Sequence, residues 1–155
     1  MTRYRNLHLD HQLCFALCSA TRAITRAYRV RLERIGLTYT QYLAFLALWE
    51  NDGQTVRGLA DRLDLDSATM TPLLKRLERA GLVTRDRSPR DERVVEVHLT
   101  DSGRELQHKA AIIQREVAAL TGMEPDEFTA LRNRLHKLAD TVSAAEQSEA
   151  VAGLQ

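Results

Sequence analysis

Apolar residues recur every three or four positions along most of the chain, the spacing of amphipathic helices. The first stripe starts at Leu13 and stops before Gly36, so we expect a helix between them. Further helices are predicted near residues 40–51, 55–63, 67–80, 100–120 and 128–142, with capping residues or breaks at their ends. From about residue 143 the chain is rich in Ala, Glu, Gln and Ser, and we expect it to fray.

The pattern changes after Gly81, where residues 82–85 and 94–99 form β-branched runs on either side of a polar segment. This order of elements predicts a mainly α fold with a small β-hairpin wing, that is, a winged helix-turn-helix. The terminal helices carry more apolar surface than one small winged helix covers, so we expect them to form a dimerisation layer. In this single chain of residues 1–155 we assign 37–99 to DNA binding, and 8–36 and 104–146 to dimerisation. A helical cap within one subunit stays an alternative.

Composition narrows the functional class. The chain has 155 residues, of which 44% are hydrophobic, so it suits one globular domain. No apolar run is long enough to span a bilayer, and we expect a cytoplasmic protein without membrane contact. Two cysteines are too few for a disulfide scaffold or a four-cysteine zinc site, and we expect neither a cofactor nor a metal.

The net charge of only +1 hides an uneven distribution along the chain. Residues 67–93 hold seven basic and four acidic side chains, whereas residues 37–66 hold two basic and five acidic ones. Near-neutrality therefore does not exclude double-stranded DNA as a partner, because one face can be basic.

The basic stretch coincides with the predicted recognition helix and wing. Short hydroxyl side chains at the start of that helix can approach bases, and cations further along can neutralise phosphates. An arginine of the wing can enter a minor groove, and a carboxylate two residues away in an extended strand shares its face and can orient it. The candidate DNA-binding residues are Ser67, Thr69, Thr71, Lys75, Arg76, Arg87, Arg90, Asp91 and Arg93.

The chain resembles the MarR family of bacterial regulators over nearly its whole length. The match is carried by residues 59–63, 66–78, 81–83, 91–93 and 99–103, including Asp91-Glu92-Arg93. The resemblance implies a homodimeric winged-helix protein, usually a repressor, that binds a palindromic operator. It also implies that Arg93 is the minor-groove arginine and that Asp91 orients it.

A narrower resemblance, to the organic hydroperoxide resistance regulators, lies in residues 9, 12–17, 28, 37–43 and 48–50. It implies that Cys14 is the redox sensor for an organic hydroperoxide. It also implies that Tyr28 and Tyr39 hydrogen-bond the thiolate across the dimer interface. The chemistry is consistent, because a thiolate attacks the O–O bond and phenolic hydroxyls stabilise a thiolate by donating to it.

Cys18 departs from this subfamily, which commonly has a tyrosine there. Two fates of oxidised Cys14 are open. A small cellular thiol can trap the sulfenic acid as an adduct, or Cys18 can resolve it. Residues four apart in a helix have Cα atoms about 6 Å apart, but their nearly parallel Cβ vectors would strain a disulfide. We favour the small thiol.

Three other functions are weighed. The main alternative is a MarR-type repressor released by a small aromatic acid bound between the dimer layer and the winged helix. A thiol peroxidase using Cys14 is less consistent with the pattern, and we expect no enzyme. A metal sensor built on His8, His11, Cys14 and Cys18 is weaker still, because these residues begin before the helix is secure.

Overall fold

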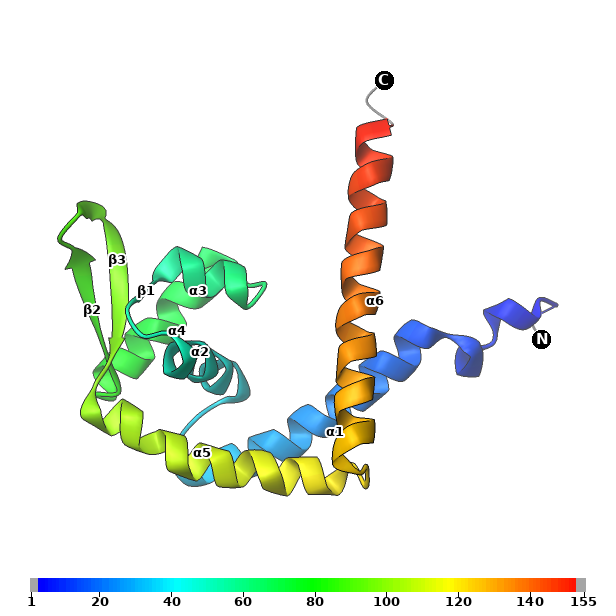
Figure 1. Ribbon diagram of the computed structural model, residues 1–155, viewed down its shortest axis with the longest axis horizontal. Coiled ribbons are helices and arrows are strands. Elements are labelled where there is room, and N and C mark those ends of the chain that lie inside the picture. The colour runs from blue at the N-terminus through cyan, green and yellow to red at the C-terminus, as the bar shows by residue number, and fades with distance from the viewer. Residues whose placement is uncertain (1–2, 153–155) are drawn as a thin grey trace. The chain divides into compact units, whose positions relative to one another are not determined.

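The structure, a computed structural model, describes residues 3–152. The chain forms two compact units, Met1–Val117 and Ala118–Gln155 (Figure 1). The elements of the first are two 3-10 turns (Arg5–Leu7 and Leu9–His11), α1 (Leu13–Leu32), a 3-10 turn (Glu33–Ile35), α2 (Tyr39–Glu50), β1 (Gln54–Thr55), α3 (Val56–Arg62), α4 (Ser67–Arg79), β2 (Val83–Ser88), β3 (Asp91–Leu99) and most of α5 (Asp101–Leu120). Nearly all of the second unit is α6 (Pro125–Ala152).

Polar caps begin the helices of the DNA-binding region. Thr38 and Gln41 form a reciprocal capping box at α2, and the Thr55 side chain accepts a hydrogen bond from the Gly58 N–H at α3. At α4 the cap is Asp66, whose carboxylate accepts from the Thr69 N–H at 2.6 Å. The three helices begin at or within one residue of the predicted starts, at Tyr39, Val56 and Ser67.

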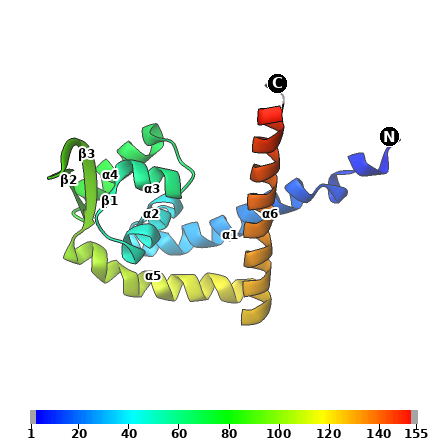
Figure 2. The same cartoon turned by 45° about the horizontal axis from the view of Figure 1, so that its top comes forward.

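The sheet is larger than the predicted hairpin. Its three strands lie in the order β1-β3-β2, all antiparallel, because Gln54 and Thr55 pair with Val97 and Glu96. The β2–β3 ladder continues to Ser88 and Asp91, so only Pro89 and Arg90 turn the chain at the tip. Hydrogen bonds between the two backbones extend the strands through residues whose polar side chains suggested a loop. In both views the hairpin stands beside α4 (Figures 1 and 2).

The expected fraying after residue 143 is wrong, because α6 continues to Ala152. Ala, Glu and Gln are strong helix formers, so the helix propagates although this segment has few apolar residues. No helix in the described part of the chain is long and apolar enough to cross a bilayer.

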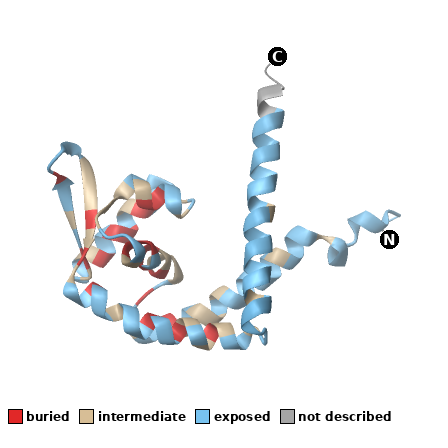
Figure 3. Cartoon of the chain, in the orientation of Figure 1, coloured by how far each residue is buried: buried red, intermediate tan, exposed pale blue. Residues whose placement is uncertain are grey.

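The core lies within the winged-helix region and one side of α5 (Figure 3). Its largest fully buried side chains are Phe45, Leu32, Leu48, Leu59, Met70, Leu74, Leu77, Val83 and Val97. Helix α5 adds Ala110, Ile113 and Val117 to this core, whereas Leu32 is the single buried residue of α1. Most of α1 and α6 therefore stays exposed in the single chain (Figure 3).

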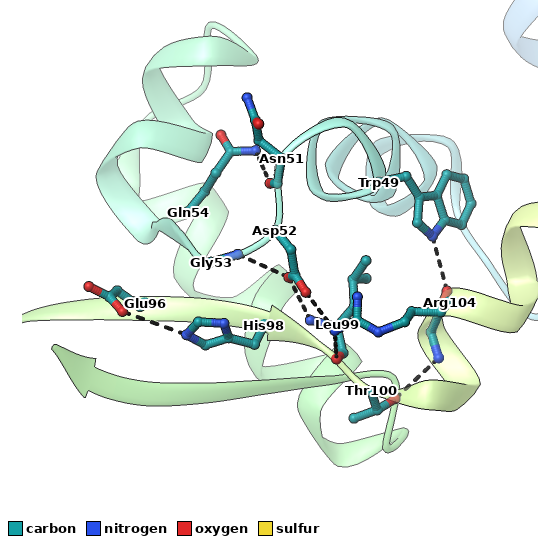
Figure 4. Close-up of polar contacts among 11 residues, drawn as sticks. Trp49, Asn51, Asp52, Gly53, Gln54, Glu96, His98, Leu99, Thr100 and Arg104 are labelled. Carbon is teal, nitrogen blue, oxygen red and sulfur yellow. Dashed lines mark hydrogen bonds and ion pairs between the residues drawn. The ribbon is translucent and has the colours of Figure 1, made fainter. Parts of the chain in front are cut away.

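Asp52 joins the end of α2 to the base of the wing and the start of α5 (Figure 4). Its Oδ1 accepts from the Leu99 N–H at 2.9 Å and the Gly53 N–H at 3.0 Å, and its Oδ2 accepts from Arg104 Nη2 at 2.7 Å. Burial opposes ionisation of this carboxyl, but the hydrogen bonds from Leu99, Arg104 and Gly53 outweigh it and hold the pKa of Asp52 below its ordinary value.

Gly103 also lies at this junction, where α2, the wing and α5 meet. Trp49 Nε1 donates to the Gly103 carbonyl at 3.1 Å, which attaches α2 to α5 (Figure 4). A Cβ at residue 103 would lie 2.1 Å from the Leu82 carbonyl oxygen, so only glycine fits there. Helix α5 therefore starts in direct contact with the wing.

Replacing Asp52 with alanine should lower the free energy of unfolding at pH 7 by about 1–3 kcal/mol, because the N–H of the buried Leu99 and two more exposed donors lose a charged acceptor. The Asp52 pKa is depressed in the folded state, so its contribution is present above the unfolded pKa and disappears as pH falls through the folded one. The difference between wild type and Asp52→Ala should therefore shrink below about pH 4.

Urea unfolding across pH 3–8 measures this difference. Asp61→Ala is the matched control, because its ion pair with Arg57, at 3.8 Å, is exposed. The control should change stability by less than about 0.5 kcal/mol. A pH-independent loss in Asp52→Ala, or equal losses in both variants, would contradict the assignment.

Candidate functional site

Both cysteines are free and exposed on the first turns of α1. Cys14 is the second residue of this helix, whose amino end favours negative charge. Cys18 follows one turn later, inside the continuous helix. A Cys14–Cys18 disulfide would therefore require the first turn of α1 to unwind.

The two predicted tyrosines come together, although they lie on different helices. The rings of Tyr28 on α1 and Tyr39 on α2 have centroids 5.3 Å apart. Both side chains are half-buried, and burial raises the pKa of each hydroxyl. The hydroxyls therefore stay protonated at neutral pH and are available as hydrogen-bond donors.

Tyr42 is a third member of this cluster, which was not predicted from the sequence. Its ring centroid lies 5.3 Å from that of Tyr28 and 6.3 Å from that of Tyr39. Its position three residues after Tyr39, on the same helical face, was a usable signal. We call Tyr28, Tyr39 and Tyr42 the tyrosine cluster.

A side-chain hydrogen bond joins Tyr42 to Tyr28. Burial raises the pKa of both hydroxyls, but the bond itself lowers the pKa of Tyr28 and raises that of Tyr42. In a hydrogen-bonded pair of phenols one hydroxyl donates and the other accepts, so one of the two protons stays available to a further acceptor.

Cys14 lies far from the tyrosine cluster of its own chain. Tyr28 comes fourteen residues after Cys14 in one unbroken helix. At about 1.5 Å per residue the two positions are about 21 Å apart along the axis. A hydrogen bond between them within one subunit is therefore impossible while α1 is intact.

Glu116 connects α1 to α5. Its Oε2 accepts from Arg31 Nε at 3.1 Å and from Arg34 Nη2 at 2.6 Å. The hydrogen bond from Arg34 is the main reason that the pKa of Glu116 lies below its ordinary value. One carboxylate thus holds two guanidinium groups near the end of the helix that carries Cys14 and Tyr28.

The predicted DNA-binding residues of α4 and the wing border two hollows. One, of about 490 Å³, lies between α3, the start of α4 and the sheet, and Ser67, Thr71 and Arg93 line it. The other, of about 310 Å³, lies between α4 and the start of α2, and Thr69 and Arg76 line it. Lys75 is exposed on α4. Arg57, a residue not singled out in the sequence, lines the first hollow as well.

The wing is held in place by contacts at its base and tip. Arg85 Nε binds Glu78 Oε2 at 3.0 Å, which links β2 to α4. At the tip, Arg87 donates to the Glu92 carbonyl at 3.2 Å, and the Arg90 N–H donates to Ser88 Oγ at 3.4 Å.

Asp91 acts on the backbone of the wing. Its Oδ1 accepts from the Arg93 N–H at 2.9 Å. The carboxylate thus orients the backbone at residue 93, and its pairing with the Arg93 guanidinium stays a prediction.

The four residues considered for a metal do not gather into a site. The rings of His8 and His11 have centroids 5.7 Å apart, and His11 Nδ1 lies 2.9 Å from the Arg5 carbonyl oxygen. Within residues 3–152, no group of three His, Cys, Asp or Glu side chains could hold a metal ion.

Comparison with known proteins identifies the family. Residues 37–95 match the MarR family. The chain is 48% identical over 136 residues to the HTH-type transcriptional regulator TtmR of Methylorubrum extorquens, covering 88% of this chain and 70% of TtmR. It is 39% identical over 140 residues to the organic hydroperoxide resistance transcriptional regulator of Bacillus subtilis, covering 90% of this chain and 95% of that protein.

A solved structure of reduced AbfR bound to DNA superimposes with a TM-score of 0.72 at 34% identity, covering 86% of this chain and 93% of AbfR. AbfR, from Staphylococcus epidermidis, has also been solved in an overoxidized DNA-bound form and in a disulfide form. These relatives and the shared winged-helix fold confirm the predicted fold class. The chain therefore belongs to the MarR family of DNA-binding transcriptional regulators.

Proposed function

We propose that the protein is a redox-sensing repressor that binds an inverted-repeat operator as a homodimer and is released when an organic hydroperoxide oxidises Cys14. The observation that carries this proposal is the tyrosine cluster of protonated donors, of which Tyr28 lies on the same rigid helix as the exposed Cys14. The Bacillus relative, named for organic hydroperoxide resistance, and the oxidised forms of AbfR support it.

The sensor is composite, and a second copy of the chain completes it. Residue 21 lies midway between Cys14 and Tyr28, which are about 21 Å apart along one α1 helix. If two α1 helices pack antiparallel about a twofold axis near residue 21, Cys14 of each subunit lies beside Tyr28 of the partner subunit. The arrangement repeats on the other side of the axis, so one dimer holds two sensors.

Exposed apolar side chains provide the surface for this dimer. They occur in both predicted dimerisation segments, 8–36 and 104–146, and comprise Leu13, Phe15, Ile24 and Val30 on α1, Ile112 and Leu120 on α5, and Leu131, Leu135 and Val142 on α6. Exposed large apolar side chains in such numbers are typical of helices that bind another protein chain. Pairing of two chains would remove it from water.

Oxidation proceeds at the Cys14 sulfur. The thiolate attacks the outer oxygen of the hydroperoxide, the O–O bond breaks, and the departing alkoxide takes up a proton, leaving a sulfenic acid and an alcohol. A small thiol then displaces the sulfenic oxygen as water and forms a mixed disulfide. We favour this route over attack by Cys18, because the intact helix holds the two Cβ vectors nearly parallel.

The change reaches DNA through α2 and α5. Tyr39 and Tyr42 belong to α2, which packs in the winged-helix core, and Glu116 couples α1 to α5. Loss of the bonds between the thiolate and the tyrosine hydroxyls shifts these helices and misplaces the recognition helix α4. A difference of about 1.4 kcal/mol between the two states changes operator affinity tenfold.

A second candidate function has an observation of its own. A hollow of about 450 Å³ lies between α2 and α5, with Leu46 and Trp49 as apolar walls and with Arg115 and Glu50 as its charged lining residues. This combination suits a small aromatic acid, whose carboxylate an arginine can bind. In this reading ligand binding, and not oxidation, releases the repressor.

Cys14→Ser should bind operator DNA as tightly as wild type but should not be released by cumene hydroperoxide, because serine cannot form a sulfenic acid. Fluorescence anisotropy of labelled operator DNA measures both properties. Cys18→Ser is the matched control and should respond like wild type. Release of Cys14→Ser by cumene hydroperoxide would refute the redox reading, and release of all three proteins by salicylate would support the aromatic ligand.

A double-mutant cycle tests the order of donors within the tyrosine cluster. Tyr28→Phe should slow oxidation of Cys14 by cumene hydroperoxide about tenfold, and Tyr42→Phe by about threefold to fivefold, since one hydrogen bond contributes ~1 kcal/mol. If Tyr42 acts through Tyr28, Tyr42→Phe has no further effect in the Tyr28→Phe protein. Stopped-flow loss of free thiol gives the rates, and additive effects would contradict this order.

Arg93→Ala should weaken operator binding by about ten- to hundredfold, or ~1–3 kcal/mol, if the guanidinium enters the minor groove. Arg132→Ala, which removes the same charge from an exposed position of α6, should leave operator affinity within about twofold. Anisotropy titrations at one fixed salt concentration compare them. Equal affinities for the two variants would remove Arg93 from the DNA interface.

A further inference from the structure

A hollow of about 470 Å³ lies between the second half of α1 and the start of α2, next to the proposed sensor. It is lined by Arg22, Thr25, Arg26, Arg29, Glu33, Leu37, Thr38 and Tyr39. Its volume falls within the range of small-molecule sites. Tyr39 belongs both to this hollow and to the tyrosine cluster, so a molecule bound here is adjacent to the proposed thiolate donors.

The charge of the hollow is strongly positive. Three arginines line it against a single acid, Glu33, whose Oε1 lies 3.9 Å from Arg29 Nε in an exposed pair. Among residues 3–152, no acidic side chain forms an ion pair with Arg22 or Arg26. Arg22 and Arg26 are four residues apart, and like charges at this spacing destabilise a helix by a few tenths of a kcal/mol. Helix stability therefore does not explain why both positions hold arginine.

We propose that this hollow is a carboxylate-binding subsite for the small molecules that react at the partner subunit's Cys14. The inference rests on the proposed function, because Tyr39 contacts that cysteine only in the dimer. Guanidinium groups match carboxylates in a bidentate geometry, and Arg22 and Arg26 are free to provide it. The buried Leu37 and the half-buried Tyr39 partly exclude water from the wall of the hollow, which strengthens this attraction.

Two reactants can carry the carboxylate. One is the hydroperoxide, which oxidises the thiolate to the sulfenic acid and leaves as an alcohol. The other is the resolving thiol, which forms the mixed disulfide and releases water. In both steps the subsite holds the anionic end of the reactant and raises its concentration at the sulfur.

Matched pairs of acid and ester probes isolate the subsite. In the first arm Cys14 is oxidised by a hydroperoxide of linoleic acid or by its methyl ester. In the second arm the sulfenic acid is captured by 3-mercaptopropionate or by its methyl ester. Free-thiol loss and intact mass measure the rates with the acid and with the ester. Dividing the acid rate by the ester rate cancels any general change in thiol reactivity.

The dimer is compared as wild type, as Arg22→Gln/Arg26→Gln, and as Arg132→Gln, which removes an exposed charge from α6 as the control. We expect the acid-to-ester ratio of the double variant to fall about tenfold in at least one arm, as loss of an arginine–carboxylate contact predicts. The arm affected identifies the source of the carboxylate. The control should keep the wild-type ratio, and added salt should lower that ratio in wild type.

Unchanged ratios in both arms of the double variant would overturn the subsite. The proposed function would survive that result, because the neutral esters would still oxidise and cap Cys14. Unchanged ratios together with weakened operator binding would assign the two arginines to the DNA backbone instead. Failure of every hydroperoxide to oxidise Cys14 would remove the proposed function, and the subsite with it.

Discussion

The rigidity of α1 is the constraint on which the rest of the proposed sensor depends. An intact helix keeps Cys14 about 21 Å from Tyr28 of the same chain, whatever the side chains do. A thiolate and its donors can then meet only between two chains. The need for a dimer follows from this separation, as does the presence of two sensors in each dimer. The exposed apolar residues of α1 lie on the same helix, so pairing would both bury them and assemble the sensor.

Signals from that helix have two physical routes to the DNA-binding region. Through the tyrosine cluster, α1 contacts α2, whose other side chains form part of the winged-helix core. Through Glu116, α1 is tied to α5, and α5 begins at the junction of Asp52, Gly103 and the wing (Figure 4). Closely packed elements of this kind move together, so in the proposed mechanism a small displacement at Cys14 is passed on to both the recognition helix and the wing.

Local sequence rules predicted much of this architecture. Thr55 and Asp66 are short polar residues before apolar stripes, and each caps a helix in the structure. The same local reasoning failed where non-local pairing decides the outcome. The two residues of β1 form a strand only because β3 passes beside them, and the strands of the wing extend into polar sequence for the same reason. The end of α6 was misjudged because low apolar content was given more weight than helix propensity.

The sequence by itself determined the helices, the wing and the uneven charge, because periodicity and capping are short-range properties, and its resemblance to the organic hydroperoxide resistance regulators supplied the candidates Cys14, Tyr28 and Tyr39. Only the tertiary structure decided which side chains meet. Tyr42 joins Tyr28, Glu116 joins Arg31 and Arg34, and Asp52 joins Leu99 and Arg104, across 14 to 85 positions of chain. These contacts depend on how helices and strands pack, and a linear pattern of residues does not contain that information.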